Sequence, residues 1–275
     1  MLRKLLAEAA YRLPRVRGKD RLFRGAIKML ARGDHFVVTR GGVNYAIEGQ
    51  DWIDYLIISN DAGSPQVVDT LAQAADGRSG CFWDIGANIG TVALPLLQRC
   101  PNLTGVLFEP SPAVMGRLMR NHALNPDIAA RCTVIPLALS DRTHWTEFYA
   151  SSEPSNSGLG GLKLAENRQS IGFKVLAHRA DELGDLVPPP DLAKIDVEGF
   201  ELEVLTGMGE LLSRHPTIVY EHSPYRFTDK GQPLDSINVF LEQRGYQVSS
   251  ARHSEMNVEE YDDFIAVRAS NEMSS

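Results

Sequence analysis

Apolar and polar positions alternate along the chain with two periods, one typical of buried strands and one typical of helices. Apolar runs of strand length occupy residues 81–84, 105–108, 133–139, 192–197, 217–220, 246–249 and 264–267. Apolar residues at helical spacing fall between them, over 91–99, 112–124, 200–213 and 234–244. Strands that alternate with helices form a parallel sheet with helices on both faces. The pattern therefore predicts an α/β fold built on a central, mostly parallel seven-stranded sheet.

The N-terminal part of the chain follows a different pattern. Residues 2–13 and 21–32 place apolar side chains at helical spacing, whereas 35–60 contains short pieces that alternate as strands do. We therefore expect an appendage of helices and β-strands over residues 1–62 and an α/β domain over residues 63–275.

Two further segments carry signals of their own. Ser64 and Pro65 are typical of a helix start and Gly77 of a helix stop, which predicts a helix over 65–76. A Ser/Gly-rich stretch at 151–161 is long for a plain connection, so we expect a lid or a substrate loop there.

Charge is distributed unevenly along the chain. Residues 1–32 carry ten basic and two acidic side chains, a net charge of +8, and the remainder carries 18 basic and 33 acidic side chains, a net charge of −15. An acidic body argues against a nucleic-acid partner, because such partners need a basic face. The basic helices predict either a peripheral contact with an anionic membrane or a glycan carrier, or packing on the body or a second subunit of a homodimer.

Cysteine usage and hydropathy point to the cytoplasm. The three cysteines, Cys81, Cys100 and Cys132, form neither an even set nor a metal-binding pair. No run of about 18 apolar residues suggests a transmembrane span, and the N-terminus lacks the apolar core of a secretory signal. We therefore expect a reducing cytoplasmic location, with peripheral contact to the inner membrane face as an option.

A glycine-rich turn follows the first strand of the predicted domain. Asp84, Gly86, Asn88 and Gly90 stand at alternate positions, and the glycines allow a ligand to approach the backbone before a helix N-terminus. Such a turn is typical of nucleotide binding. Asn88 and Thr91 depart from the G-x-G-x-x-G fingerprint of dinucleotide binding, which disfavours a nicotinamide cofactor.

Two more strand ends carry side chains suited to a nucleoside. Glu109 ends the second apolar strand nineteen residues after Gly90, where a carboxylate can accept both ribose hydroxyls. Ser140 and Asp141 close the next apolar strand, so Asp141 is a candidate for the adenine amino group. A helix-capping acid at Glu109 and an ordinary turn at Ser140 are the structural alternatives.

Charged residues also interrupt a later apolar strand. Lys194, Asp196 and Glu198 occur at period two, which places them on one side of the sheet or at its rim. Buried charges are costly unless they are paired or functional, so these residues predict either a salt bridge with a helix start or a catalytic group.

An acid and a histidine end the following apolar strand. His222 is a candidate general base, with Glu221 or Asp196 holding its other ring nitrogen. Asp196, Glu221 and His222 are also a candidate divalent-metal set, although no spacing in the sequence enforces it.

The ordered set of motifs resembles the FkbM family of S-adenosylmethionine-dependent methyltransferases. The resemblance covers about residues 65–250 and is carried by the motifs at 82–90, 108–112, 138–141, 194–201 and 204–207. It implies a Rossmann-like methyltransferase fold with S-adenosylmethionine near Asp84, Gly86, Asn88 and Gly90. It also implies that the ribose lies on Glu109 and the adenine near Asp141.

The resemblance further implies methyl transfer to oxygen, often to a hydroxyl of a sugar, a glycoconjugate or a natural product. An in-line displacement needs an aligned acceptor and a base, for which Asp196 and His222 are candidates, with Lys194 and Glu198 beside them. Asp196 would also lie beside the cofactor's methyl group. A metal that polarises the acceptor is the competing mechanism. A non-catalytic cofactor-binding partner protein and a nicotinamide-dependent oxidoreductase are the alternative functions.

Overall fold

The computed structural model describes residues 2–12, 25, 35–49, 51–59, 65–151, 170–252 and 255–269. Most of the helix expected at 21–32 and nearly all of the Ser/Gly-rich loop expected at 151–161 lie outside these residues. The membrane or carrier contact of the basic N-terminus, the homodimer and the cytoplasmic location stay predictions.

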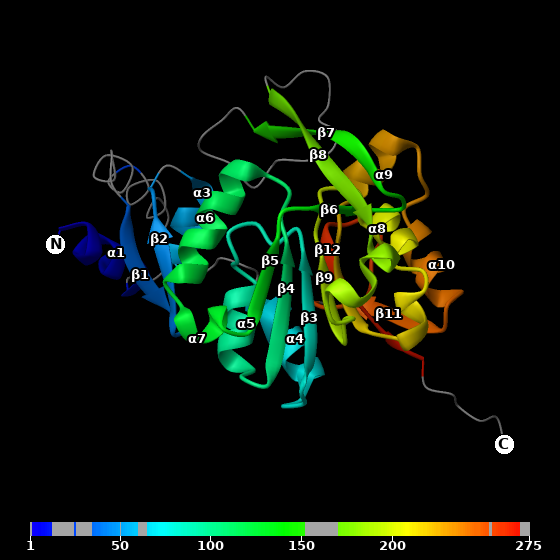
Figure 1. Cartoon of the computed structure of the whole chain (residues 1–275), viewed down its shortest axis with the longest axis horizontal. Coiled ribbons are helices and arrows are strands. Elements are labelled where there is room, and N and C mark those ends of the chain that lie inside the picture. The colour runs from blue at the N-terminus through cyan, green and yellow to red at the C-terminus, as the bar shows by residue number, and fades with distance from the viewer. Residues whose placement is uncertain are drawn as a thin grey trace.

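A seven-stranded sheet forms the centre of the molecule, in the order β11-β12-β10-β9-β3-β4-β5 (Figure 1). Its strands are β3 (Gly80–Ile85), β4 (Leu103–Phe108), β5 (Cys132–Ile135), β9 (Leu192–Ile195), β10 (Thr217–His222), β11 (Tyr246–Ser250) and β12 (Asp262–Arg268). β12 is antiparallel to both of its neighbours, and the other paired strands run parallel. The predicted seven-stranded, mostly parallel sheet is confirmed.

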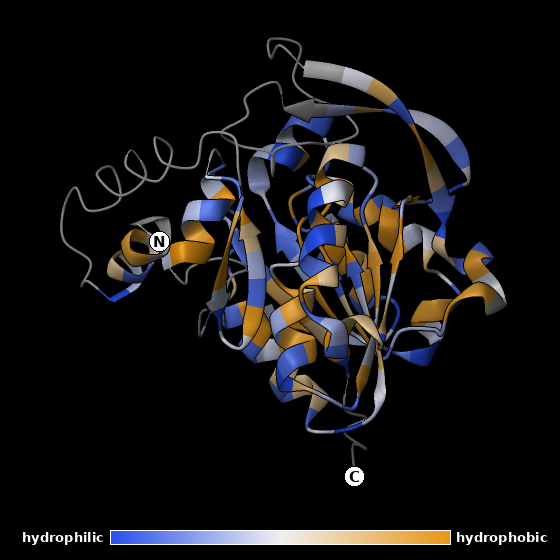
Figure 2. Ribbon diagram, turned by 60° about the vertical axis from the view of Figure 1, so that its left-hand side comes forward, coloured by the Kyte–Doolittle hydropathy of each residue, from blue (hydrophilic) through white to orange (hydrophobic). Residues whose placement is uncertain are grey.

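Helices cover both faces of this sheet, as predicted. They are α4 (Pro65–Ala75), α5 (Ala93–Arg99), α6 (Pro112–Ala123), α7 (Pro126–Ala129), α8 (Glu201–Gly207), α9 (Pro224–Lys230) and α10 (Ser236–Glu242), with 3-10 helices η2 (Ala180–Leu186) and η3 (Leu211–Arg214). Strand alternation separates two cores, because Phe82 of β3 packs in the core with α4, α5 and α6 whereas Trp83 packs in the core with α8 and α10. Figure 2 shows hydrophobic residues concentrated on the central strands and on the helices beside them.

Two predicted elements are each divided in the structure. The strand expected at 133–139 is broken at Pro136, which has no N–H for the ladder, and its second half forms β6 (Ala138–Ser140). The helix expected at 200–213 ends with Gly207, where any Cβ would lie 1.9 Å from the carbonyl oxygen of Ser140. β6 pairs with β8 (Ser170–Arg179), which pairs with β7 (His144–Ser151), in a three-stranded sheet that the sequence pattern did not predict.

The N-terminal part packs directly against the sheet domain. It contains α1 (Leu2–Arg12), the hairpin β1 (Phe36–Arg40) and β2 (Val43–Ile47), and α3 (Trp52–Ser59). Tyr45, Ile47 and Ile58 belong to the same core as the α4–α6 face. The helix expected at 2–13 and the strands expected in the first part of 35–60 are confirmed. The end of 35–60 forms helix α3 instead of a strand, because burial of its apolar side chains overrides their strand propensity. The domain boundary at 62 stays a prediction.

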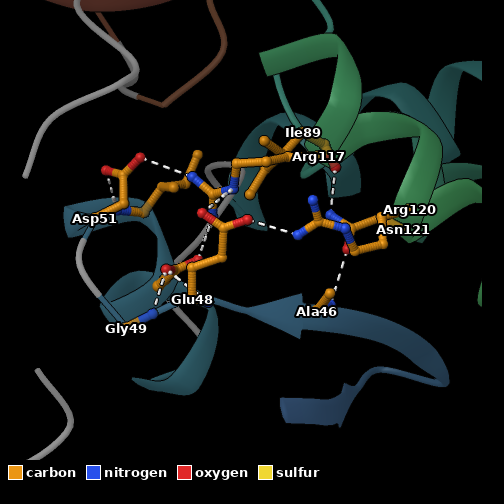
Figure 3. A network of polar contacts seen from close by, with 10 residues as sticks. Ala46, Glu48, Gly49, Asp51, Ile89, Arg117, Arg120 and Asn121 are labelled. Atoms are coloured by element: carbon orange, nitrogen blue, oxygen red, sulfur yellow. Dashed lines mark hydrogen bonds and ion pairs between the residues drawn. The ribbon is translucent and has the colours of Figure 1, made fainter. Parts of the chain in front are cut away.

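A buried ion network ties this N-terminal part to α6 (Figure 3). The Arg117 guanidinium donates to Asp51 Oδ2 at 2.8 Å and to Asp54 Oδ1, and the backbone N–H of Gly49 donates to Asp54 Oδ2 at 2.8 Å. Burial raises the pKa of Asp54 to about 6, although Arg117 opposes that rise. The network joins segments more than sixty positions apart.

No helix within the described residues is long and apolar enough to cross a bilayer.

We predict that Arg117→Met lowers the free energy of unfolding by about 3–5 kcal/mol, because it leaves two buried carboxylates without their cation. The loss should be greater at about pH 8 than at about pH 5. Burial raises the pKa of Asp54, so the contribution of this group to stability is present at low pH and lost as pH rises through its folded-state pKa. Chemical unfolding at both pH values measures this difference.

Arg120→Met is the matched control on the same helix. Arg120 pairs with Glu48 at 2.6 Å, and its side chain is 40% exposed. A surface pair contributes less than about 1 kcal/mol, so this variant should change stability little. Equal losses in the two variants would contradict a special role for the buried network.

Candidate functional site

A cleft of about 140 Å³ opens at the carboxyl ends of the parallel strands. Gly86 follows β3, Glu109 follows β4, Asp196 follows β9, and Glu221 is the penultimate residue of β10. All four line the cleft, together with Phe148 of β7. The strand order reverses between β3 and β9, which is where ligands bind in open α/β sheets. The predicted assembly of strand ends is present in the fold.

Gly86 is required by a close approach between two strand ends. Its φ is +82°, and a Cβ here would lie 1.9 Å from the backbone oxygen of Asp196. The N–H groups of Gly86 and Ala87 both donate to the Phe108 carbonyl, at 3.0 and 2.9 Å. Gly90 is buried below the turn and donates its N–H to the Ala87 carbonyl at 2.9 Å. The turn therefore brings bare backbone to the cleft.

Glu109 joins the ends of β3 and β4. Its Oε2 accepts the Asn88 N–H at 3.0 Å, and its Oε1 accepts the Ser111 N–H at 2.8 Å. Burial raises the pKa of Glu109 to about 7, against the effect of both N–H donors. A carboxylate has about four lone-pair positions, so two remain for a ligand. Both the ribose role and the capping alternative are compatible with this geometry.

Asn88 adds an unsatisfied acceptor to the same wall. Its Oδ1 is buried without a hydrogen-bond partner among the described residues, and its φ is +52°. Leaving such an atom without a partner costs about 1–3 kcal/mol, which a bound donor would recover. This unsatisfied atom and the open positions on Glu109 fit a nucleoside ligand.

Asn121 of α6 holds the glycine-rich turn from behind (Figure 3). Its Nδ2 donates to the Ile89 carbonyl at 2.9 Å, and its Oδ1 accepts the Ala46 N–H of β2 at 2.8 Å. Asn125 joins the same hairpin at Asn44 but has no recorded contact with the turn. The buried amide of Asn121 thus links the N-terminal hairpin to the turn.

Lys194 and Asp84 lie behind the wall of the cleft. The Lys194 Nζ is 2.9 Å from Asp196 Oδ2 and 3.8 Å from Asp84 Oδ1, and the other Asp84 oxygen accepts the Ala93 N–H at 3.2 Å. Burial raises the pKa of Asp84 to about 6. Burial opposes the charge of Lys194, but Asp196 and Asp84 raise its pKa. The predicted salt bridge is present, and it orients Asp196 toward the cleft.

Glu198 shares the acidic end of the cleft with Asp196. It pairs with Arg226 of α9, and its φ is +56°. The buried Glu201 stabilises this conformation, because its Oε1 accepts the N–H groups of Val197 and Gly199, both at 3.0 Å. Burial and Asp196 raise the pKa of Glu198 to about 7.

Glu221 and His222 point to opposite faces of β10, because neighbouring strand residues alternate. Glu221 lines the cleft, and the hydroxyl of Tyr261 donates to its Oε1 at 2.6 Å. His222 is fully buried with its ring stacked on Phe264 at a centroid distance of 4.9 Å. Its Nε2 donates to the Val258 carbonyl at 2.7 Å, and burial lowers its pKa.

This placement does not favour two of the roles considered for His222. The ring faces the core rather than the cleft, so it is not positioned to take a proton from a ligand there. Asp196, Glu221 and His222 do not converge, and the described part of the chain contains no group of three His, Cys, Asp or Glu side chains that could hold a metal ion. The donor set does not fit a resident divalent metal.

Ser140 and Asp141 hydrogen-bond to each other, with Ser140 Oγ donating to Asp141 Oδ1 at 3.1 Å. The cleft wall on this side is formed instead by Leu137, Ala138 and Leu139, with Phe148 beside them. The break at Pro136 places Asp141 beyond that wall. An adenine contact of Asp141 stays a prediction.

Tyr261 and Arg226 were not predicted from the sequence. Tyr261 precedes β12 and reaches Glu221 only because β10 and β12 pair. Arg226 reaches Glu198 because α9 folds back over the end of β9. Neither residue belongs to a motif, so no signal in the sequence marks it.

Comparison with known proteins identifies the family. The profile described as Methyltransferase FkbM domain matches residues 84–248. The hexuronic acid methyltransferase AglP of Haloferax volcanii is 34% identical over 164 residues, which cover 58% of this chain and 62% of that protein. The match therefore spans less than two thirds of the length of that relative.

Two further proteins are similar to this chain. Methyltransferase sdnD of Sordaria araneosa is 29% identical over 201 residues, covering 62% of this chain and 74% of that protein. The crystal structure of methyltransferase FkbM from Methylobacillus flagellatus aligns with a TM-score of 0.49 at 18% identity, over 90% of this chain and 60% of that chain. The family profile covers more than half of the sequence and coincides with the cleft, so the chain belongs to the FkbM methyltransferase family.

Proposed function

We propose that this chain transfers a methyl group from S-adenosylmethionine to a hydroxyl of a sugar, a glycoconjugate or a natural product. The observation that carries the proposal is Glu109, a carboxylate with open acceptor positions across the glycine-rich turn. Membership of the FkbM family supports the methyltransferase class. The hexuronic acid methyltransferase among the relatives supports a carbohydrate acceptor.

The residues of the cleft divide into three groups along its length. Glu109 and Asn88 would hold the ribose, and the apolar wall with Phe148 would cover the adenine. Asp196, Glu198 and Glu221 would surround the methionine end and the acceptor. When bound, S-adenosylmethionine supplies a methyl group already activated on a positively charged sulfur.

The protein then has two tasks. It aligns the acceptor oxygen with the methyl group at about 3 Å, and it removes the hydroxyl proton. Asp196 lines the cleft, and its Oδ2 is fixed by the Lys194 ammonium. That ion pair orients Asp196 at the wall of the cleft and balances its negative charge.

We predict that Glu109→Ala weakens S-adenosylmethionine binding about 10- to 150-fold, because hydrogen bonds to a charged group contribute about 1.5–3 kcal/mol. Titration calorimetry measures both dissociation constants. The exposed Glu242→Ala is the control and should bind as the wild type does. Binding of NADH in place of S-adenosylmethionine would contradict the proposal.

Methyl transfer itself is tested with a radiolabelled methyl donor and a panel of free sugars and uronic acids. Incorporation of label into an alkali-stable ether supports transfer to a hydroxyl. Label found only as an ester of a uronic acid would show a carboxylate acceptor and contradict the hydroxyl assignment.

We also predict that Asn121→Ser weakens S-adenosylmethionine binding about tenfold more than Asn125→Ser does. Both substitutions remove a connection to the hairpin, but only Asn121 holds the Ile89 carbonyl in the turn. A buried group left without its partner costs about 1–3 kcal/mol. Calorimetry, with thermal unfolding as the measure of stability, separates the two effects. Equal weakening by both substitutions would argue that the hairpin contributes only stability.

A further inference from the structure

Three carboxylates at and beside the acidic end of the cleft are each paired with a cation. The pairs are Lys194 with Asp196, Arg226 with Glu198, and Arg252 with Asp263. Glu221 faces this group from β10, opposite Asp263 in the strand register. Among the described residues no cation lies within ion-pair distance of Glu221, and its recorded partner is the neutral hydroxyl of Tyr261.

Tyr261 orients Glu221 without neutralising it. The Tyr261 hydroxyl donates to Oε1 at 2.6 Å, and within the described residues Oε2 has no hydrogen-bond partner, in a side chain that lines the cleft. Asp196 and Glu198 line the same end, but each is paired with a cation. Glu221 is therefore the carboxylate among these three that has no cation within ion-pair distance in the described part of the chain.

The surroundings of Glu221 favour its protonated form in the free protein. The facing groups are Asp196 and Glu198 after β9, Glu201 of α8, Asp263 of β12, Lys194 of β9 and Tyr261. Burial, followed by Asp196 and Glu198, raises the pKa of Glu221 well above its ordinary value, and the Tyr261 hydrogen bond opposes that rise. A positive charge brought into the cleft would shift the balance toward the carboxylate.

We propose that Glu221, held by Tyr261, is the base of this site, and that the positive charge of the bound methyl donor releases its proton to solvent and leaves a carboxylate for the acceptor. This inference rests on the proposed function. In the transfer, the acceptor oxygen forms a bond to the methyl carbon as the bond from that carbon to sulfur breaks. The hydroxyl proton moves to Glu221, and the sulfur becomes a neutral thioether.

The cycle is balanced in charge at the acidic end of the cleft. When the donor binds, the site gains the positive charge of the sulfur and Glu221 loses a proton. When the methyl group is transferred, the sulfur loses its charge and Glu221 gains the proton of the acceptor hydroxyl. Burial makes an isolated carboxylate unfavourable. For the same reason, the protonation of Glu221 depends on the charge of the bound cofactor.

Proton counting tests the inference without an acceptor. S-adenosylmethionine and S-adenosylhomocysteine, which lacks the methyl group and the positive charge on sulfur, are titrated into the full chain in two buffers of different ionisation enthalpy near neutral pH. We expect the wild type to release more protons with S-adenosylmethionine. Glu221→Gln should remove most of the difference, with Glu198 left to supply the remainder, and the exposed Glu242→Gln should retain all of it.

Tyr261→Phe is the second variant, suited to the test because Tyr261 is 52% exposed and its removal should not disturb folding. Loss of the hydrogen bond removes an effect that lowers the pKa of Glu221. The donor-dependent proton release should therefore shift to higher pH in this variant, a change that a merely structural role would not produce.

The outcomes separate this inference from the proposed function. Equal proton release with the two ligands in the wild type, or a difference that is undiminished in Glu221→Gln, would overturn the role of Glu221 while the cofactor assignment stands. Failure of the wild type to bind either ligand would overturn the proposed function, and this inference with it.

Discussion

The carboxyl ends of β3 and β9 meet in direct backbone contact, and the geometry of the cleft depends on that contact. At Gly86 there is no room for a Cβ, because the Asp196 carbonyl oxygen would lie 1.9 Å from it. The Asp196 N–H donates to the Ile85 carbonyl at 3.0 Å, which fixes the two strand ends in register. The contact places the glycine-rich turn beside the charged strand end, so both line one cleft.

Buried charge is the second constraint on the site. Asp84, Glu109 and Glu198 all have a raised pKa, because burial disfavours their charged form. Each binds a proton more strongly in the folded chain than in the unfolded chain, so its contribution to stability is lost as pH rises through the folded-state value. These carboxyls therefore lower the stability of the folded chain near neutral pH, and they nevertheless lie at the strand ends. Such an arrangement is common where ionisable groups are functional.

Much of the fold could be predicted from the sequence, since strand-length and helix-length apolar periods carry it. The glycine turn, Glu109 and the Lys194–Asp196 pair followed from residue types at strand ends. The general-base role considered for His222 is not favoured by the structure. A position at a strand end does not reveal which face of the sheet a side chain takes, and here Glu221 faces the cleft whereas His222 faces the core.

Residues that act through pairing between distant segments could not be predicted. Tyr261 and Asn121 lie outside every motif, and their contacts exist only because β12 pairs with β10 and α6 packs on the hairpin. The three-stranded sheet was missed for a similar reason, since Pro136 redirects the chain away from the central sheet. Tertiary contacts of this kind leave no periodic trace in a single sequence.

A crystal structure of the complex with S-adenosylhomocysteine tests the ligand arrangement most directly. The cleft geometry predicts both ribose hydroxyls on the Glu109 carboxylate, with the sulfur directed to the end formed by Asp196 and Glu221. A ligand bound with its ribose away from Glu109, or outside this cleft, would contradict it.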